Sequence, residues 1–100
     1  MFIYNITTQV DALITADWIR WQKEIHIPEL MATGAFFDHR FYQLVEEDTH
    51  DTITYVIQLY CHSRTDYEDY VRLQAARLRE KAFTQWGHRF ISFRTLLMPV

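Results

Sequence analysis

The spacing of the apolar residues switches several times along the chain, and the order of these switches constrains the fold most strongly. Apolar and polar residues alternate over four segments, which predicts β-strands at Phe2–Thr8, Ala35–Val45, Thr52–His62 and His88–Leu97. Two intervening segments instead repeat their apolar residues every three or four positions, as amphipathic helices do. The sequence therefore predicts the order strand, helix, strand, strand, helix, strand.

The first predicted helix begins after Asp11, whose carboxylate can cap the free N–H groups of the first turn. Its apolar stripe consists of Ile14, Trp18, Trp21 and Ile25. Pro28 is expected to end this helix, because the residue before a proline, here Ile27, disfavours helical dihedral angles. A short further turn is expected at 29–31, and Gly34 is then expected to adopt a positive φ.

The second predicted helix begins at a capping box, Thr65-Asp66-Tyr67-Glu68, in which a hydroxyl and a carboxylate stand three residues apart. This helix is expected to end near Gly87. The polar run Glu46–Asp51 predicts a hairpin loop between the second and third strands. The 100 residues include two glycines and two prolines and no linker-like segment, so one domain, 1–100, is expected.

This order of elements predicts a ferredoxin-like α+β fold, βαββαβ. Right-handed crossovers place the four strands in one antiparallel sheet, in the spatial order fourth, first, third, second. Both helices then lie on one face of the sheet. The other face is left uncovered in an isolated chain.

The uncovered face is predicted to mix polar and large apolar side chains. Its polar members are Asn5, Arg40, Tyr42, Gln58, Ser92 and Arg94, and its apolar and aromatic members are Ile3, Val56, Tyr60, Phe90 and Leu96. Such surfaces occur in clefts and oligomer interfaces more often than in full contact with water. The chain is 49% hydrophobic and 16% aromatic, more than a small domain hides easily, so a homodimer is predicted.

Several segments resemble known proteins. The order βαββαβ, the tryptophan-rich first helix that ends in His26-Ile27-Pro28-Glu29, and the mixed sheet face are similar to the dimeric α+β barrel proteins. More narrowly, residues 3–7, 21–29, 31–36 and 90–97 resemble a small bacterial family of unknown function. The resemblance implies that two sheets pack face to face as a dimeric α+β barrel, and it implies no particular activity.

His26 is the candidate catalytic residue. The His-x-Pro formed by His26 and Pro28 is similar to one near the cleft of barrel proteins linked to small-molecule degradation. That similarity implies a general base or a hydrogen bond to a substrate, since histidine titrates near neutral pH. The alternative is a structural histidine that bonds a free carbonyl at the end of its helix. The sequence places no partner beside His26, so both interpretations stay open.

The six polar residues of the uncovered face are the candidate ligand-binding residues. Arg40 and Arg94 could hold a carboxylate through paired hydrogen bonds, and Asn5 and Gln58 could orient a polar ligand. Equally, these residues could form a wet dimer interface, in which the arginines pair with Asp38 or with carboxylates of the second copy. The sequence does not separate the two interpretations.

Composition argues against several classes of function. The formal net charge is -3, so no nucleic-acid partner is expected, and no apolar run approaches the roughly 20 residues of a membrane span. Cys61 is the single cysteine, which allows no internal disulfide and favours a cytoplasmic location. Neither a metal nor another cofactor is expected, because the remaining histidines are scattered over different elements: His39, His50, His62 and His88.

Three functions are compatible with these features. The first is a homodimer whose cleft binds a small anionic or aromatic molecule. The second is a cofactor-free monooxygenase-like or isomerase-like enzyme with His26 as its base. The third is a structural or interaction module in which the mixed face joins two chains. A closed cavity in the dimer, with His26 and Arg94 opening into it, would favour the first two, and a filled barrel would favour the third.

Overall fold

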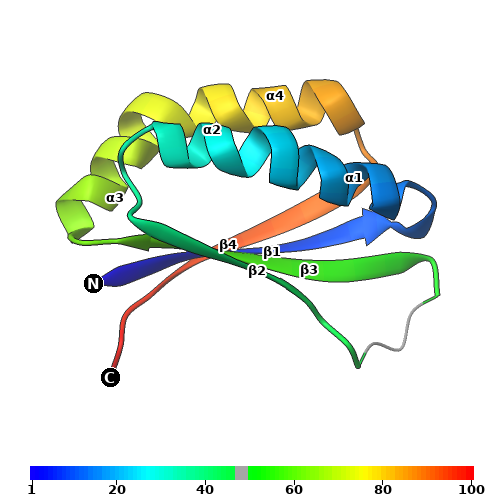
Figure 1. Ribbon diagram of the computed structural model, residues 1–100, viewed down its shortest axis with the longest axis horizontal. Helices are drawn as coiled ribbons and strands as arrows, with labels where there is room; N and C mark the ends of the chain where they lie inside the picture. Colours follow the sequence, from blue (N-terminus) through cyan, green and yellow to red (C-terminus); the bar gives the residue numbers. More distant parts are fainter. Residues whose placement is uncertain (47–49) are drawn as a thin grey trace.

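The computed structural model describes residues 1–46 and 50–100, and its elements follow the predicted order (Figure 1). The strands are β1 (Phe2–Asp11), β2 (Asp38–Gln43), β3 (Thr52–Cys61) and β4 (Phe90–Leu97). They form one antiparallel sheet in the order β2-β3-β1-β4, which confirms the predicted neighbours. The chain therefore has a ferredoxin-like α+β fold.

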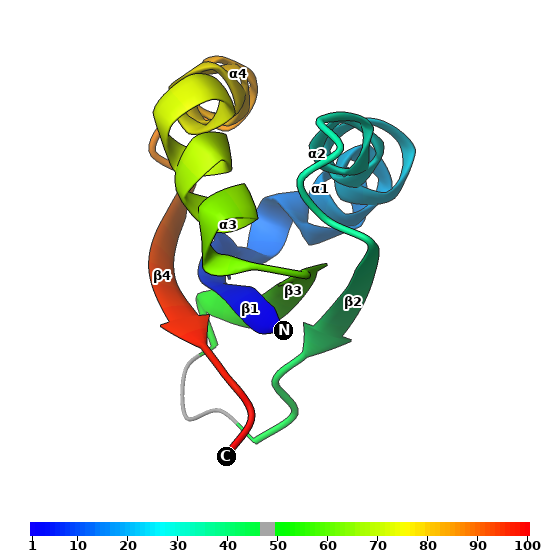
Figure 2. The same ribbon diagram turned by 90° about the vertical axis from the view of Figure 1, so that its left-hand side faces the viewer.

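Two helical arms connect the strands. The first arm joins β1 to β2 through a 3₁₀ turn (Ala12–Ile14), α1 (Thr15–Trp21), a π-helical segment (Gln22–His26) and α2 (Ile27–Ala32). The second arm joins β3 to β4 through α3 (Arg64–Tyr70), a π-helical segment (Val71–Ala75) and α4 (Ala76–Trp86). Figure 2 shows both arms on one face of the sheet, while the edge strands β2 and β4 curve away from the arms on either side. No described helix covers the other face.

The prediction that Pro28 ends the first helix is wrong. Ile27 has helical dihedral angles, φ −61° and ψ −44°, and the arm continues through α2. The Ile27 N–H donates to the Gln22 carbonyl, five residues earlier, so the helix widens by one residue just before the proline. A wider turn gives room for the proline ring, which would otherwise clash with a carbonyl of the preceding turn.

The caps of the helical arms are partly as predicted. Asp11 Oδ1 accepts a hydrogen bond of 2.9 Å from the Leu13 N–H, as expected for a cap. The second arm begins two residues earlier than predicted, because Ser63 is extended and its Oγ accepts from the Asp66 N–H at 3.1 Å. Thr65, the predicted cap, already lies inside α3. Gly34 and Gly87 both adopt positive φ, which confirms the sites predicted for the helix ends.

Several strand ends differ from the prediction, including the C-terminal ends of β2, at Gln43 instead of Val45, and of β3, at Cys61 instead of His62. β1 continues to Asp11 because it pairs with both β3 and β4 along its whole second half. β2 begins only at Asp38, since Phe36 leaves the sheet and packs among core aromatic rings. β4 begins at Phe90 instead of His88. The predicted loop Glu46–Asp51 includes residues 47–49, which lie outside the described residues.

The core lies between the sheet and the helical arms. Alternate residues of β1 and β3 point into it, as the sequence predicts, and are buried: Tyr4, Ile6, Thr8 and Val10 from β1, and Tyr55, Ile57, Leu59 and Cys61 from β3. Trp18 of α1 packs against Tyr55, with ring centroids 5.1 Å apart. The Cys61 thiol is fully buried and lies 3.5 Å from the Phe2 carbonyl oxygen. Burial raises the pKa of this thiol.

The predicted faces of β4 are wrong, and this moves two candidate ligand-binding residues. Ser92 is paired with Thr8 and Arg94 with Ile6, so both side chains lie on the face that the helical arms cover. A hydrogen bond of 2.8 Å between the Thr8 and Ser92 hydroxyls agrees with this register. Phe90 and Leu96 move to the covered face with them, and the uncovered face of β4 carries Ile91, Phe93, Thr95 and Leu97.

The other four candidate ligand-binding residues keep their predicted face. Cross-strand pairing places Asn5 opposite Gln58, and Gln58 opposite Arg40. Tyr42 lies two residues further along β2, on the same side of the sheet as Arg40. The structure therefore divides the six predicted residues between two faces of the sheet.

Candidate functional site

A small enclosed space lies between the two helical arms and the sheet, and we call it the inter-helix cavity. Apolar core residues form much of its wall, and its polar lining residues are Thr8, Gln22, His26, Tyr70, Arg79, Ser92 and Arg94. Its volume is about 40 Å³, which is room for roughly three water-sized groups. The cavity brings His26 together with Ser92 and Arg94, although the sequence placed those two on the opposite face.

Gln22 gives the cavity a buried polar group that lacks a partner. Its side chain is 4% exposed, and its Oε1 has no hydrogen-bond donor among the described residues. A buried carbonyl oxygen left without a donor costs about 1–3 kcal/mol. Gln22 is the first residue of a π-helical segment, and such segments occur frequently at functional sites.

His26 closes the same π-helical segment and stacks on Trp21, with ring centroids 4.6 Å apart and planes 16° apart. Its Nδ1 is buried without a partner in the described part of the chain. Burial lowers the pKa of His26 to about 4 and outweighs the opposing effect of Glu29. The imidazole is therefore neutral at neutral pH, so it can accept a hydrogen bond on one nitrogen.

Two arginines from different elements stand at the rim of the inter-helix cavity. Arg79 of α4 donates a hydrogen bond of 2.9 Å to the hydroxyl of the buried Tyr4. Arg94 of β4 is exposed and forms neither a hydrogen bond nor an ion pair with another described residue. Both guanidinium groups act on Tyr70, whose pKa burial nevertheless raises. The rim is thus positively charged and has hydrogen-bond donors free for an anion.

Few side-chain interactions join the two arms across the cavity. Lys81 of α4 forms an ion pair of 3.0 Å with Glu29 of α2. Trp86 of α4 packs edge-on against Trp21, with ring centroids 6.0 Å apart, and its Nε1 is buried without an acceptor among the described residues.

The polar residues on the uncovered face are already bonded to one another. Gln58 donates to Asn5 Oδ1 at 3.3 Å and accepts from the Tyr60 hydroxyl at 2.9 Å. Arg40 forms an ion pair of 2.7 Å with Asp38, which agrees with the interpretation that the arginines of this face pair with nearby carboxylates. This face therefore offers fewer free polar groups than the inter-helix cavity does.

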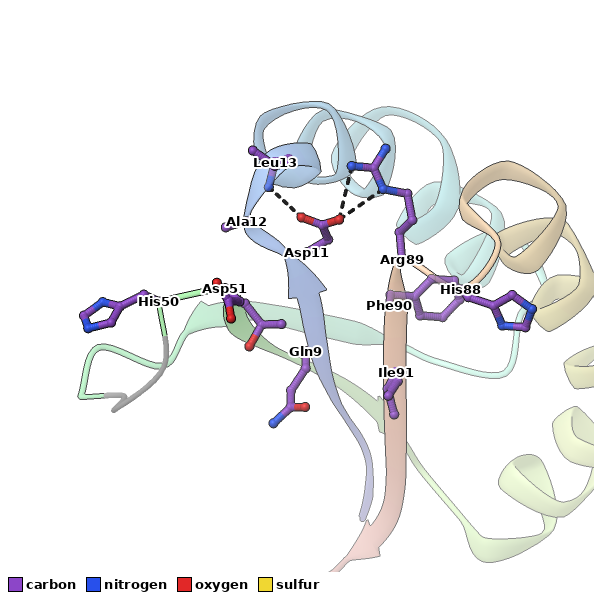
Figure 3. Close-up of a pocket in the computed structure, with 11 residues that line it drawn as sticks. Gln9, Asp11, Ala12, Leu13, His50, Asp51, His88, Arg89, Phe90 and Ile91 are labelled. Atoms are coloured by element: carbon purple, nitrogen blue, oxygen red, sulfur yellow. Dashed lines mark hydrogen bonds and ion pairs between the residues drawn. The ribbon is translucent and has the colours of Figure 1, made fainter.

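The largest surface depression lies where β1 ends and β4 begins (Figure 3). Its volume is about 540 Å³. Arg89 and Asp11 pair across it at 3.2 Å, and the bond from Leu13 together with Arg89 lowers the pKa of Asp11. Figure 3 shows His50 and His88 on opposite sides of this depression. Asp11 and Arg89 satisfy each other there, so these two charges are not free for a ligand.

Neither a metal site nor a membrane span is found in the parts of the chain that the structure describes. No three His, Cys, Asp or Glu side chains within 1–46 and 50–100 gather closely enough to hold a metal ion. Within the same two ranges, no helix has the length and apolar character required to cross a membrane.

Sequence reasoning identified His26 but missed Gln22 and Arg79. A signal for Gln22 was present, because it follows Trp18 by four residues and so interrupts the apolar stripe with an amide. Arg79 gave no such signal, since it is one of several arginines on its helix. Its place at the rim depends on how the second arm lies over β1.

The fold and the cavity define the class of protein: a small ferredoxin-like α+β domain with two helical arms on one sheet face. The chain belongs to the DUF4286 family, described as a domain of unknown function, whose model matches residues 1–100. No curated protein matches the chain.

A solved structure has the same fold as this chain. It is that of an ethyl tert-butyl ether D (EthD) family protein from Bacillus halodurans C-125. The two structures superpose with a TM-score of 0.74, over 100% of each chain, at 10% sequence identity. At this identity the similarity establishes the fold alone.

Proposed function

We propose that the protein binds a small organic anion at the inter-helix cavity. The observation that carries this proposal is the set of buried polar atoms without partners at an enclosed space, Gln22 Oε1 and His26 Nδ1, below the positively charged rim. Buried polar atoms in native proteins are nearly always bonded. A ligand that supplies the missing bonds is therefore expected, with its charge at Arg79 and Arg94.

Binding describes this site better than catalysis by His26. An efficient general base has a pKa near the working pH, whereas the pKa of His26 is about 4. No carboxylate among the described residues bonds the imidazole to orient it, as the orienting group of a catalytic histidine does. A neutral histidine that accepts a hydrogen bond fits a binding site.

Titration calorimetry of the full chain with straight-chain carboxylates of two to six carbons, and with benzoate, tests the proposal. At least one of these anions is expected to bind. Arg94→Gln should weaken the binding by about 1–3 kcal/mol, because it removes a charge-assisted hydrogen bond. Arg72→Gln is the matched control, since Arg72 pairs with Asp69 outside the cavity. If no anion binds, or if both variants lose the same affinity, the proposal is wrong.

We further propose that two copies pair through the uncovered sheet face. Its apolar side chains are unusually exposed for a folded domain, with Ile91 58% and Phe93 59% accessible. Tyr42 and Leu97 add further apolar area at the two edges of the same face. Exposed apolar area of this kind, with bonded polar groups at its centre, is typical of an interface between protein chains. In this arrangement the inter-helix cavity lies on the side of each sheet away from the partner.

A further inference from the structure

We infer that the ligand group that enters the inter-helix cavity is a hydrogen-bond donor, a hydroxyl or an ammonium, while the acid group of the same ligand stays at the rim. This inference rests on the proposed binding of an organic anion. It narrows the ligand to an acid that carries a donor at its other end.

The first argument is the chemistry of the cavity floor. The unpartnered atom of Gln22 is a carbonyl oxygen, which accepts hydrogen bonds and cannot donate them. His26 is neutral, and in the tautomer protonated at Nε2 its buried Nδ1 is also an acceptor. Both residues line the cavity, and neither acceptor has a donor among the described residues, so a ligand group that enters beside them is expected to donate. A carboxylate there would meet the Gln22 oxygen with like partial charge.

The second argument is size. A volume of about 40 Å³ has room for one hydroxyl or ammonium group and the carbon that bears it, since each of these groups takes about the space of one water molecule. The rest of the ligand must then extend towards the rim. Apolar residues of the cavity itself, among them Leu30, Ile57 and Leu78, suit the carbon that bears the donor.

The third argument is the separation of charge in the site. The guanidinium groups of Arg79 and Arg94 lie at the rim and are exposed, whereas Gln22 is 4% exposed. A carboxylate at the rim keeps part of its hydration and gains charge-assisted bonds. A single ligand with a donor at one end and an acid at the other satisfies both parts of the site.

The experiment compares matched ligands on the full chain by titration calorimetry. The straight-chain carboxylate that binds best is compared with its analogues that carry a hydroxyl or an amine on the terminal carbon. The hydroxyl or the amine analogue is expected to bind at least about tenfold more tightly than the methyl parent. Comparison of the two analogues shows which donor is preferred. The preference should disappear in Gln22→Met, and it should persist in the control Gln85→Met at an exposed position of α4.

Each outcome separates this inference from the proposal on which it rests. If the methyl parent binds as tightly as both analogues, the donor inference is wrong while anion binding stands. If the hydroxyl or amine analogue still binds more tightly than the methyl parent in Gln22→Met and in His26→Phe, the ligand does not donate to these two residues. The donor inference is then also wrong. If no ligand of the series binds, the cavity holds water alone, and both the inference and the proposed function are wrong.

Discussion

At the scale of single residues, the distinctive feature is a pair of polar side chains placed where apolar ones would pack better. Gln22 continues the apolar stripe of the first arm, and His26 stacks on Trp21 with one nitrogen buried. A core selected for stability alone would carry methionine or leucine at such a position. The proposed binding of an organic anion depends on these two side chains.

His26 is expected to make the fold less stable as the pH falls from about 6.5 to about 4. Its folded-state pKa, about 4, lies below the ordinary value of 6.5, so in this range the unfolded chain binds a proton that the folded chain does not. The loss of unfolding free energy should reach about 2–4 kcal/mol below both values. Above pH 6.5 the residue adds no pH dependence.

Urea unfolding at pH 7.5 and at pH 4.5 measures this effect. The matched variant is His26→Phe, which keeps an aromatic ring on Trp21 but cannot ionise. The native chain should lose more stability between the two pH values than the variant loses. Equal losses in the two proteins would show that His26 does not carry the pH dependence.

At the scale of elements, the sequence predicted every strand and both arms, and it failed where the information was not local. The alternation in β1 and β3 identified their faces, because one set of residues in each is consistently more apolar. β4 is apolar on both sides, so its alternation does not say which set faces the helices. Its register depends on pairing with β1, including the bond from the Asp11 N–H to the Arg89 carbonyl oxygen. Arg94 was therefore assigned to the wrong face.

The same reasoning explains which part of the candidate site was predictable. His26 stood out because a histidine two residues before a proline marks a local irregularity. The partners that the structure gives it come from α4 and β4, far away in the sequence. The π-helical segment that places Gln22 and His26 on the cavity also depends on how the arm packs, which periodicity alone does not determine.

On the outer edge of β2, neighbouring side chains bond both backbone groups of His39. The bond from the Leu44 N–H to the Thr54 carbonyl oxygen fixes the ladder, so the backbone groups of His39 point away from β3. Asp38 accepts from the His39 N–H at 2.8 Å, and Arg40 donates to the His39 carbonyl oxygen at 2.8 Å. The ion pair between Asp38 and Arg40 joins the two bonds. Charged groups on an edge strand hinder pairing with strands of other chains.

Removal of these two side chains should promote association through β2. The double variant Asp38→Ala/Arg40→Ala is expected to form species larger than the native protein, because it frees both backbone groups of His39 for a further strand. Light scattering coupled to size-exclusion chromatography measures the masses at raised concentration. The control removes another exposed ion pair, Arg64 with Glu68 on α3, and should leave the mass unchanged. An unchanged mass in the β2 variant would contradict the prediction.

At the scale of the whole molecule, the two faces of the sheet have different roles. One face carries the helical arms and the inter-helix cavity, and the other is curved and bears no described helix (Figure 2). This second face is rich in exposed apolar side chains. The interface proposed for the second face leaves the rim arginines of the first face free. Binding of a ligand and pairing of chains can therefore be tested separately.

Phe93→Glu is expected to convert the protein from a dimer to a monomer. Phe93 lies on the uncovered face and is 59% exposed, and a carboxylate there would be buried without a partner on pairing. Sedimentation equilibrium at micromolar concentration should give the native protein twice the chain mass of 12.1 kDa and should give the variant the mass of one chain. Phe83→Glu, a comparably exposed phenylalanine on α4, should remain dimeric. A native protein that sediments as one chain would rule out the proposed interface.

The buried thiol of Cys61 can report local unfolding, because a labelling reagent reaches it only when the structure opens. It is the single cysteine, it is fully shielded at the end of β3, and its raised pKa keeps it protonated. A thiol-specific dye can reach it only when the structure around it opens, so the labelling rate counts these openings without any added probe. An acid that binds should slow the labelling of Cys61, and an acid that does not bind should leave the labelling rate unchanged.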